Sequence, residues 1–204
     1  MPLSPSHSRR WRAVLVSLAA LPLLVACTVP AGTFNAGTSA LVNGILRAQD
    51  GRGTANGIMT TNDSTSSPLT LQSVELIDSH GLEVVDAFTF SPEAQLPVGA
   101  RVPPRAADYE DDPEHGREVL ANWENRVPVN QSVFAPREAR LLVVVVRATS
   151  PEDCLYAKGL RVNYRQYGRD LYVESNAAVI LSYDPVNDQC GAVSDEIFAH
   201  PAVG

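Results

Sequence analysis

This 204-residue chain has few residues suited to catalysis or metal binding, and they lie far apart in the sequence. His80, His115 and His200 stand in a turn signal, an acidic segment and the C-terminal tail, and no G-x-S-x-G, H-E-x-x-H or paired C-x-x-C motif occurs. A copper site would need more soft ligands than Met59 and these histidines offer. We therefore predict no catalytic residue, no cofactor and no enzymatic activity.

One acidic cluster has the residue types that bind hard cations. It places five carboxylates within seven residues: Asp108, Glu110, Asp111, Asp112 and Glu114. Calcium takes about six to eight oxygen ligands, but the spacing does not match a D-x-D-x-D-G loop, and Pro113 stiffens the middle. We predict a solvated acidic segment and no metal site, and we keep the five carboxylates as the candidate ligands if a cation does bind.

The first cysteine ends an apolar run that follows a basic segment. Arg9, Arg10 and Arg12 precede the apolar residues 13–26, and the first 26 residues contain no acidic side chain. This order is typical of a secretory signal peptide. Because the run is shorter than the ~20 residues that span a bilayer, we do not expect it to remain as a transmembrane helix.

The residues Leu24-Val25-Ala26-Cys27 resemble a bacterial lipobox. The resemblance implies that diacylglycerol is attached to Cys27 and that a peptidase removes residues 1–26. Two acyl chains suit stable anchoring, because each buried methylene contributes only about 0.8 kcal/mol and a single chain binds reversibly. We expect a lipid anchor on Cys27 at the extracytoplasmic face of the cell membrane. The alternative is a plain secretory signal or signal anchor with an incidental cysteine.

The charge of the chain argues against a nucleic-acid partner. Loss of the three signal-peptide arginines would change the formal net charge from -7 to -10, and the remaining chain has one lysine, Lys158, and twelve scattered arginines. Nucleic acids and anionic lipids are held by clusters of Lys and Arg. The charge pattern therefore disfavours nucleic-acid binding, and it also disfavours attachment to anionic lipid through a polybasic segment.

The other two cysteines, Cys154 and Cys190, are predicted to form a disulfide. Export to an oxidising compartment and the absence of C-x-x-C spacing favour a structural bond over free thiols. The simple loop-closure model gives such a bond roughly 4 kcal/mol. If the loops around both cysteines lie at the same end of the domain, the bond attaches the C-terminal residues 191–204 to it.

Strands are expected to position these residues, since short apolar segments alternate with turn residues from Ser39 onward and no helical period is sustained. Residues 27–38 comprise Cys27 and a small, Gly-rich segment, which predicts a flexible tether. Residues 39–47 predict an edge strand or a helical turn, and 57–62 a strand. The run at 139–146 is apolar throughout, as in a strand that is buried on both faces.

Two hairpins are expected. The first spans 69–90 around Ser79-His80-Gly81, with a β-bulge where the alternation slips near Gln72 and Ser73. One face of its second strand should carry Leu82, Val84, Phe88 and Phe90. The second hairpin follows GLRVNYR and points Leu160, Val162 and Tyr164 inward.

Between the hairpins, residues 91–118 are rich in proline and acidic residues and predict an unusually long polar loop. Trp123 follows this segment. Its neighbours Val119 and Leu120 favour packing in the core or against a loop over exposure as a partner anchor.

About seven strands with regular turn signals predict an all-β, antiparallel sandwich. Residues 133–183, with their apolar strand, cysteine loop and GLRVNYRQYGR hairpin, resemble the immunoglobulin-like domains of uncharacterised actinobacterial exported proteins. The resemblance implies a single immunoglobulin-like domain over 39–204, and it brings no motif for activity. The cysteines depart from antibody domains, where the disulfide joins two core strands.

Taken together, these features predict a membrane-anchored, non-enzymatic lipoprotein that serves as a protein-interaction or scaffold module of the cell envelope, with its loops as the recognition surface. One alternative is a ligand- or cation-binding receptor that uses residues 91–118, and another is a small envelope hydrolase. A deep apolar pocket would favour the alternatives, and a flat exposed aromatic patch would favour a protein partner.

Overall fold

The computed structural model describes residues 32–37, 42–45, 52–94, 100–152, 154–182 and 189–199, and for residues 42–45, 189 and 198 it describes the backbone only. All of these residues belong to one compact unit, Gly32–Gly204. Cys27 and His200 lie outside the described residues.

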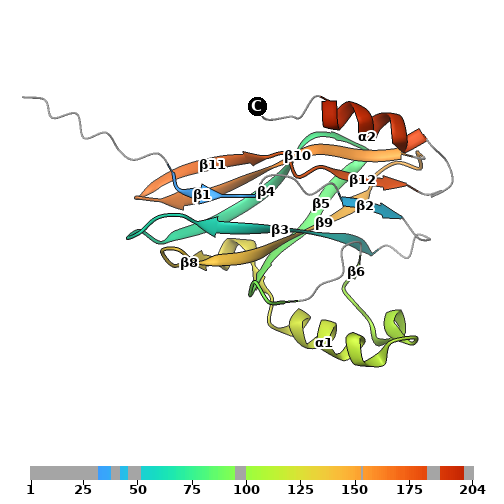
Figure 1. Cartoon of the computed structure of the whole chain (residues 1–204), viewed down its shortest axis with the longest axis horizontal. Helices are drawn as coiled ribbons and strands as arrows, with labels where there is room; N and C mark the ends of the chain where they lie inside the picture. The colour runs from blue at the N-terminus through green and yellow to red at the C-terminus, as the bar shows by residue number, and fades with distance from the viewer. Residues whose placement is uncertain are drawn as a thin grey trace, which may run out of the picture. The chain divides into compact units, whose positions relative to one another are not determined.

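Two β-sheets form the molecule (Figure 1). Sheet A has the order β1 (Phe34–Asn35), β3 (Gly53–Asn62), β9 (Ala139–Ala148), β5 (Leu82–Phe90), β7 (Val127–Pro128), with β6 (Arg101–Val102) also on β3. Sheet B has the order β2 (Val42–Ile45), β12 (Val179–Ser182), β10 (Cys154–Gln166), β4 (Leu69–His80), β8 (Val133–Phe134), with β11 (Arg169–Ser175) also on β10. The predicted immunoglobulin-like β-sandwich is confirmed. Among the described strands, β2 and β12 are the one pair that is parallel.

The described residues form twelve strands instead of about seven. The additional strands are mostly two-residue edge pairings, such as β1 and β8, which are too short to show a period in the sequence. Residues 42–45 form a strand, which resolves the choice left open by the sequence.

A hydrophobic core fills the space between the sheets. The residues of β9 alternate across it, with Leu142, Val144 and Val146 in this core and Val143 and Val145 in a second cluster on the outer face of sheet A. The prediction that this strand is buried on both faces is therefore confirmed.

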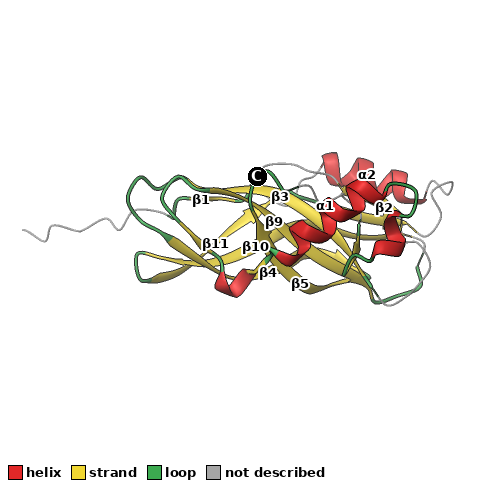
Figure 2. Ribbon diagram, turned by 90° about the horizontal axis from the view of Figure 1, so that it is seen from below, coloured by secondary structure: helices red, strands yellow, loops and turns green. Residues whose placement is uncertain are grey.

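Helix α1 (Pro113–Glu124) covers the outer face of sheet A (Figure 2). It begins after Asp112, whose side chain accepts a hydrogen bond from the backbone N–H of His115 at 3.1 Å. Val119 and Trp123, one turn apart, are buried, which confirms the packing expected for Trp123. The expected long loop at 91–118 is wrong from residue 101 onward, where the segment contains β6, the 3-10 helix η1 (Ala106–Tyr109) and the first half of α1.

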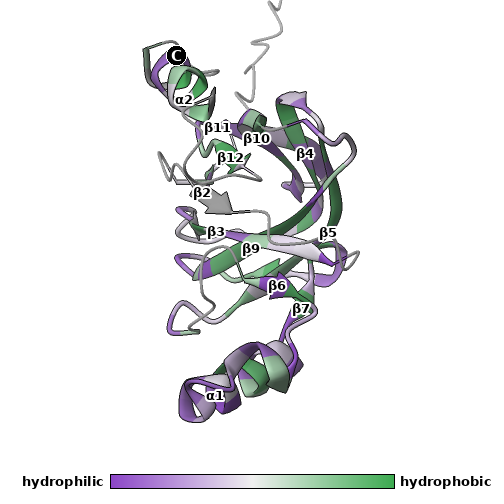
Figure 3. Ribbon diagram, turned by 90° about the vertical axis from the view of Figure 1, so that its right-hand side faces the viewer, coloured by the Kyte–Doolittle hydropathy of each residue, from purple (hydrophilic) through white to green (hydrophobic). Residues whose placement is uncertain are grey.

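Helix α2 (Gln189–Ala199) covers part of the outer face of sheet B, so the two helices lie on opposite sides of the sandwich (Figure 3). Val193 and Ile197 pack with Ala178 and Ile180 on β12 and just before it. The region expected to be a C-terminal tail, residues 191–204, is therefore helical over residues 191–199.

β4 and β5 do not form the predicted hairpin, because they lie in different sheets. β4 pairs with β10 and β5 pairs with β9. Gly81 connects them with a positive φ of 67°, a conformation that glycine adopts without strain. Each of the two strands has alternating apolar residues and therefore needs one buried face. Because the turn takes the chain from sheet B to sheet A, both strands can bury that face.

Both strands contain a bulge. Tyr164 pairs with Leu71 and Asn163 with Ser73, so Gln72 is the extra residue and the predicted bulge is confirmed. A second bulge at Val85 exchanges the two faces of β5. Leu82 and Ala87 consequently face the inner core, whereas Phe88 and Phe90 lie in the outer cluster, so the predicted single face for this strand is wrong.

The predicted tether is too long at its C-terminal end. Residues 32–37 belong to the sandwich, since β1 pairs with the end of β3 and Phe34 is buried against Phe134 and Tyr164. The rest of the expected tether, 27–31 and 38, lies outside the described residues.

The second predicted hairpin, β10–β11, is confirmed. Its register pairs Gln166 with Arg169, and Leu160, Val162 and Tyr164 point into the core as expected.

Candidate functional site

The predicted disulfide between Cys154 and Cys190 is present, with the two Cα atoms 5.3 Å apart. It joins the first residue of β10 to the second residue of α2. Both cysteines pack against the small apolar cluster beneath α2. The bond therefore attaches a covering helix, as expected, and is not part of a reactive site.

The acidic residues have separate roles and do not form a cation site. Arg52 makes a bidentate ion pair with Asp108, at 2.6 and 2.8 Å, and the backbone N–H of Arg105 also donates to this carboxylate. The hydrogen bond from Arg52 is the main cause that lowers the pKa of Asp108 from its ordinary 3.8 to about 2. Asp112 caps α1.

The other three candidate ligands, Glu110, Asp111 and Glu114, are exposed. Across the described part of the chain, no group of three or more His, Cys, Asp or Glu side chains is placed to hold a metal ion.

The two described histidines make local contacts. His80 pairs with Glu152 and stacks on Tyr156, with ring centroids 5.4 Å apart. The ring of His115 lies edge-on to Tyr109, with the ring centroids 5.8 Å apart, beside the capped start of α1. These contacts hold a turn and a helix start in place.

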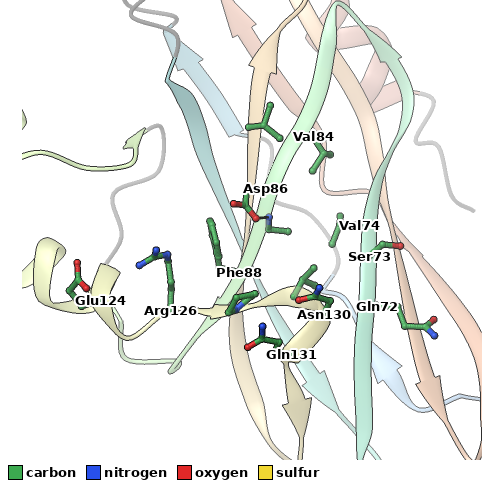
Figure 4. Close-up of a pocket in the computed structure, with 14 residues that line it drawn as sticks. Gln72, Ser73, Val74, Val84, Asp86, Phe88, Glu124, Arg126, Asn130 and Gln131 are labelled. Carbon is green, nitrogen blue, oxygen red and sulfur yellow. Dashed lines mark hydrogen bonds between the residues drawn. The ribbon is translucent and has the colours of Figure 1, made fainter.

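A groove of about 800 Å³ lies between β4 and β5 (Figure 4). Its lining comes from the bulged parts of both strands and from the segment after α1: Gln72, Ser73, Val74, Val84, Val85, Asp86, Ala87, Phe88, Glu124, Arg126, Pro128, Val129, Asn130 and Gln131. Half of these side chains are apolar, so the groove is not the deep apolar pocket that would favour a small-molecule receptor.

The groove runs beside two strand edges. β8 pairs only with Leu69 and Thr70 of β4, and β7 pairs only with Phe88 and Thr89 of β5. In the segments that the structure describes, no strand pairs with the rest of these two edges, residues 72–80 and 82–87. Unpaired N–H and C=O groups along a strand can pair with an additional extended chain.

A crossing segment closes one end of the groove. Residues 127–134 pass from sheet A to sheet B, and their anchor is Ser132, which is fully buried. The Ser132 and Thr89 hydroxyl oxygens are 2.7 Å apart, and the Ser132 carbonyl accepts a hydrogen bond from the N–H of Leu71 at 3.0 Å. Ser132 therefore fixes the position of β4 relative to β5 at this end of the groove.

The side chains of the groove offer apolar and charged contacts side by side. Val74 and Val84 lie between the two strands in Figure 4, and Val85 is 39% exposed at its bulge. Near the crossing segment, the guanidinium of Arg126 lies 4.4 Å from the Trp123 ring centroid and donates to the Trp123 carbonyl at 2.8 Å. Arg126 has no ion-pair partner within the described residues, although Asp86 and Glu124 also line the groove.

The sequence contains two breaks in alternation at this groove, but these breaks were not enough to predict the groove. The alternation breaks at Gln72 and again at Asp86, and the two bulges that cause those breaks lie on facing sides of the groove. A break in alternation predicts a bulge, but it does not show that two bulges meet, since this depends on β4 and β5 lying in opposite sheets.

Comparisons with known proteins find no family model and no curated protein that matches the chain. Among solved structures, it is similar to the adhesin CfaE of enterotoxigenic Escherichia coli, with a TM-score of 0.35 and 12% identity over 76% of this chain and 49% of that one. The chain thus spans about half the length of the CfaE chain.

It is also similar to the PapD-like domain 7 of human CEP192, with a TM-score of 0.33 and 8% identity over 90% of this chain and 100% of that one. The CooA pilin subunit of enterotoxigenic Escherichia coli has a TM-score of 0.31 and 11% identity, over 76% of this chain and 100% of that one.

No helix of the described residues has the length and apolar character needed to cross a membrane.

Proposed function

We propose that the protein is a non-enzymatic, lipid-anchored interaction module of the cell envelope that binds an extended segment of a partner protein in the β4–β5 groove. The observation that carries the proposal is the pair of strand edges, 72–80 and 82–87, that lie unpaired beside a half-apolar groove. An extended peptide would gain main-chain hydrogen bonds from an edge and side-chain contacts from the groove.

The lining indicates what kind of segment would fit. Val74, Val84 and Val129 offer apolar surface to alternate side chains of an extended peptide, because such side chains point to one side at every second position. Arg126 offers a guanidinium without an ion-pair partner among the described residues, which suits a carboxylate on the bound segment. We therefore propose an extended segment with apolar residues at alternate positions and an acidic residue near one end.

The lipobox supports the anchored location. Cys27 follows a basic segment and an apolar run, and the first described residue is Gly32, only five positions later. A lipid on Cys27 would hold the sandwich close to the extracytoplasmic face of the membrane, where it could meet envelope partners.

A small-ligand or cation receptor is the less supported alternative. The acidic residues that would form its site are divided between an ion pair, a helix cap and exposed positions. The groove is half polar and extends along strand edges, which suits an extended chain better than a compact ligand.

The proposal is tested by photocrosslinking in the source cells. A photoreactive amino acid replaces Val85 in the full chain, and a matched position, the exposed Thr149, serves as the control outside the groove. We expect one protein to crosslink from position 85 and not from position 149. Detection of the same products at both positions would contradict a groove-specific partner.

A charge placed at the bulge gives an independent prediction. Val85→Lys should abolish capture of that partner, because a lysine at a strand edge opposes pairing and fills the groove with a charge. Val133→Lys is the matched control, since Val133 is 51% exposed and does not line the groove. Both variants change an exposed residue, so the free energy of unfolding should stay within about 0.5 kcal/mol of the unmodified protein. Unchanged capture by Val85→Lys would reject the groove as the binding site.

A further inference from the structure

The chain enters the sandwich at one end, which is formed by three turns. The backbone N–H of Thr33 donates to the side-chain oxygen of Gln166 at 3.1 Å, and the N–H of Asp63 donates to the Thr33 carbonyl at 2.8 Å. Gly32 lies so close to Tyr164 that a Cβ atom there would collide with the Tyr164 hydroxyl. Residues 63–68, 135–138 and 166–169 make up this end, which we call the entry end.

The entry end is close to the anchor if Cys27 is lipidated. Five residues of fully extended chain reach at most about 17 Å, and this bounds the separation of Cys27 from Gly32. The ten residues of β3, whose last residue lies at the entry end, cover about 33 Å. Because the lipid fixes Cys27 at the membrane surface, the entry end stays within about 17 Å of the anchor, whereas the far end can lie much further from it.

Exposed apolar and aromatic side chains gather toward the same end. The described residues include five exposed large hydrophobic side chains: Met59, Val85, Val133, Tyr167 and Tyr172. All except Val85 lie within about four residues of the entry end along their strands, as the pairing of β1, β3, β4, β8, β10 and β11 shows. Met59 faces outward from sheet A, whereas Val133 and Tyr172 face outward from sheet B, so these side chains surround the entry end on different faces. Of the four, Tyr167 alone belongs to one of the three turns of the entry end.

Tyr167 occupies an unusual position in the turn between β10 and β11. Gln166 pairs with Arg169, so Tyr167 and Gly168 form a two-residue turn, with φ angles of 54° and 71°. Such turns favour Asn-Gly, and a bulky residue at positive φ costs roughly 1 kcal/mol. The Tyr167 ring, 37% exposed, therefore stands at the tip of this hairpin at a cost in backbone energy, and its hydroxyl oxygen lies 3.4 Å from the hydroxyl oxygen of Ser64 in the neighbouring turn.

Charge favours the same orientation. The exposed arginines Arg137, Arg165 and Arg169 lie in or next to the turns of the entry end, where their number equals that of the acidic residues. The acidic segment is placed at the other end, since Asp108 is bound to Arg52 immediately before the start of β3. This distribution keeps most of the negative charge away from an anionic bilayer.

From these observations we propose that the entry end docks on the membrane surface, with Tyr167 in the headgroup layer. The inference rests on the proposed lipid anchor at Cys27. Tyrosine suits this layer because its ring is apolar and its hydroxyl is wet, and arginine can extend its guanidinium to lipid phosphates. In the docked orientation, the three turns contact the bilayer. The far end, which includes the acidic segment, points away from it.

The test uses the full lipidated chain in vesicles of phosphatidylglycerol and phosphatidylethanolamine. An environment-sensitive fluorophore is attached through Thr65→Cys at the entry end, or through Thr149→Cys, an equally exposed threonine at the far end. We expect lipids with quenching groups near the headgroup to quench the Thr65 probe several-fold more than the Thr149 probe. Equal quenching, or stronger quenching at Thr149, would overturn the orientation.

Tyr167→Asn sharpens the test, because asparagine suits the positive φ, while the ring and its hydroxyl contact with Ser64 are removed. This variant should fold normally and reduce quenching at Thr65, whereas Tyr172→Thr on β11 should change it less. No change with Tyr167→Asn would remove Tyr167 from the contact.

Mass spectrometry of the same preparation separates the two proposals. Absence of lipid on Cys27 would overturn the anchor and this inference with it. Lipid present on Cys27, with quenching at the wrong end, would overturn the orientation alone.

Discussion

The two outer faces of the sandwich are covered by helices that are held in different ways. On sheet A, α1 inserts Trp123, whose ring centroid is 5.1 Å from that of Phe88, and the neighbouring η1 is tied to the start of β3 by the Arg52–Asp108 ion pair. On sheet B, the described side chains that α2 contributes to a small cluster are Cys190, Val193 and Ile197, and the helix is bonded covalently through Cys190.

This difference indicates how much each helix can contribute to stability through packing alone. A buried tryptophan removes a large apolar area from water, whereas the described side chains that α2 adds to its cluster are a cysteine, a valine and an isoleucine. We expect α1 to be held mainly by packing and α2 mainly by the disulfide. Both arrangements leave the edges of β4 and β5 uncovered. The groove lining includes Glu124, the last residue of α1, and Arg126, which donates to the Trp123 carbonyl, so the groove depends on the position of α1, whereas none of its lining residues comes from α2.

The largest expected effect is at Trp123. Trp123→Ala should lower the free energy of unfolding by about 3–5 kcal/mol, because it removes a buried ring and leaves a cavity between α1 and Phe88. Denaturation in urea measures the change. Leu120→Ala, on the same helix but only half buried, should cost clearly less. An equal cost for both would mean that Trp123 is not the anchor of α1.

Removal of the disulfide should cost somewhat less, and its effect should be concentrated on α2. The Cys154→Ser and Cys190→Ser double variant should lose about 2–4 kcal/mol, since the bond closes a long loop. Hydrogen exchange should become fast in residues 189–199 while α1 remains protected. A melting curve unchanged from that of the bonded protein would show that packing alone holds α2.

The smallest of these stability effects belongs to the Arg52–Asp108 pair and depends on pH. The pKa of Asp108 is about 2 in the folded protein, below its ordinary 3.8. A lowered pKa means that the pair stabilises the fold above pH 3.8 and that this contribution is lost as the pH falls from 3.8 toward 2.

Asp108→Asn should therefore lower the free energy of unfolding by about 1 kcal/mol at neutral pH, a value reduced because the carboxylate is partly exposed to solvent, and by almost nothing near pH 2. Asp111→Asn, at an exposed position, is the control and should change stability little at either pH. A loss for Asp108→Asn that does not vary with pH would contradict the ion-pair explanation.

The parts of the fold that the sequence predicted correctly are those set by local alternation. The β10–β11 hairpin and the doubly buried β9 follow from which residues are apolar, and the bulge at Gln72 follows from a break in that pattern. The crossing of β4 and β5 between sheets was not predictable in this way, because an alternating strand shows one buried face without showing which sheet it joins.

Other differences arise from weak signals. α1 has few apolar residues and follows a proline-rich acidic segment, so the Val119–Trp123 spacing and the start signal Asp112-Pro113 were weak indications of a helix. β1 is two residues long, and its place in the sandwich depends on long-range contacts of Phe34 and Thr33. The groove depends on these non-local features. The sequence could therefore indicate individual residues of the groove, but it could not show that they lie next to one another.

The central claim is that a partner binds as an extended segment in the β4–β5 groove. Hydrogen exchange tests it most directly, measured on the protein alone and with the partner that was identified by crosslinking from position 85. The account predicts new protection of backbone amides in residues 72–80 or 82–87, with no change in β11. Protection confined to other surfaces, with these two edges unchanged, would contradict it.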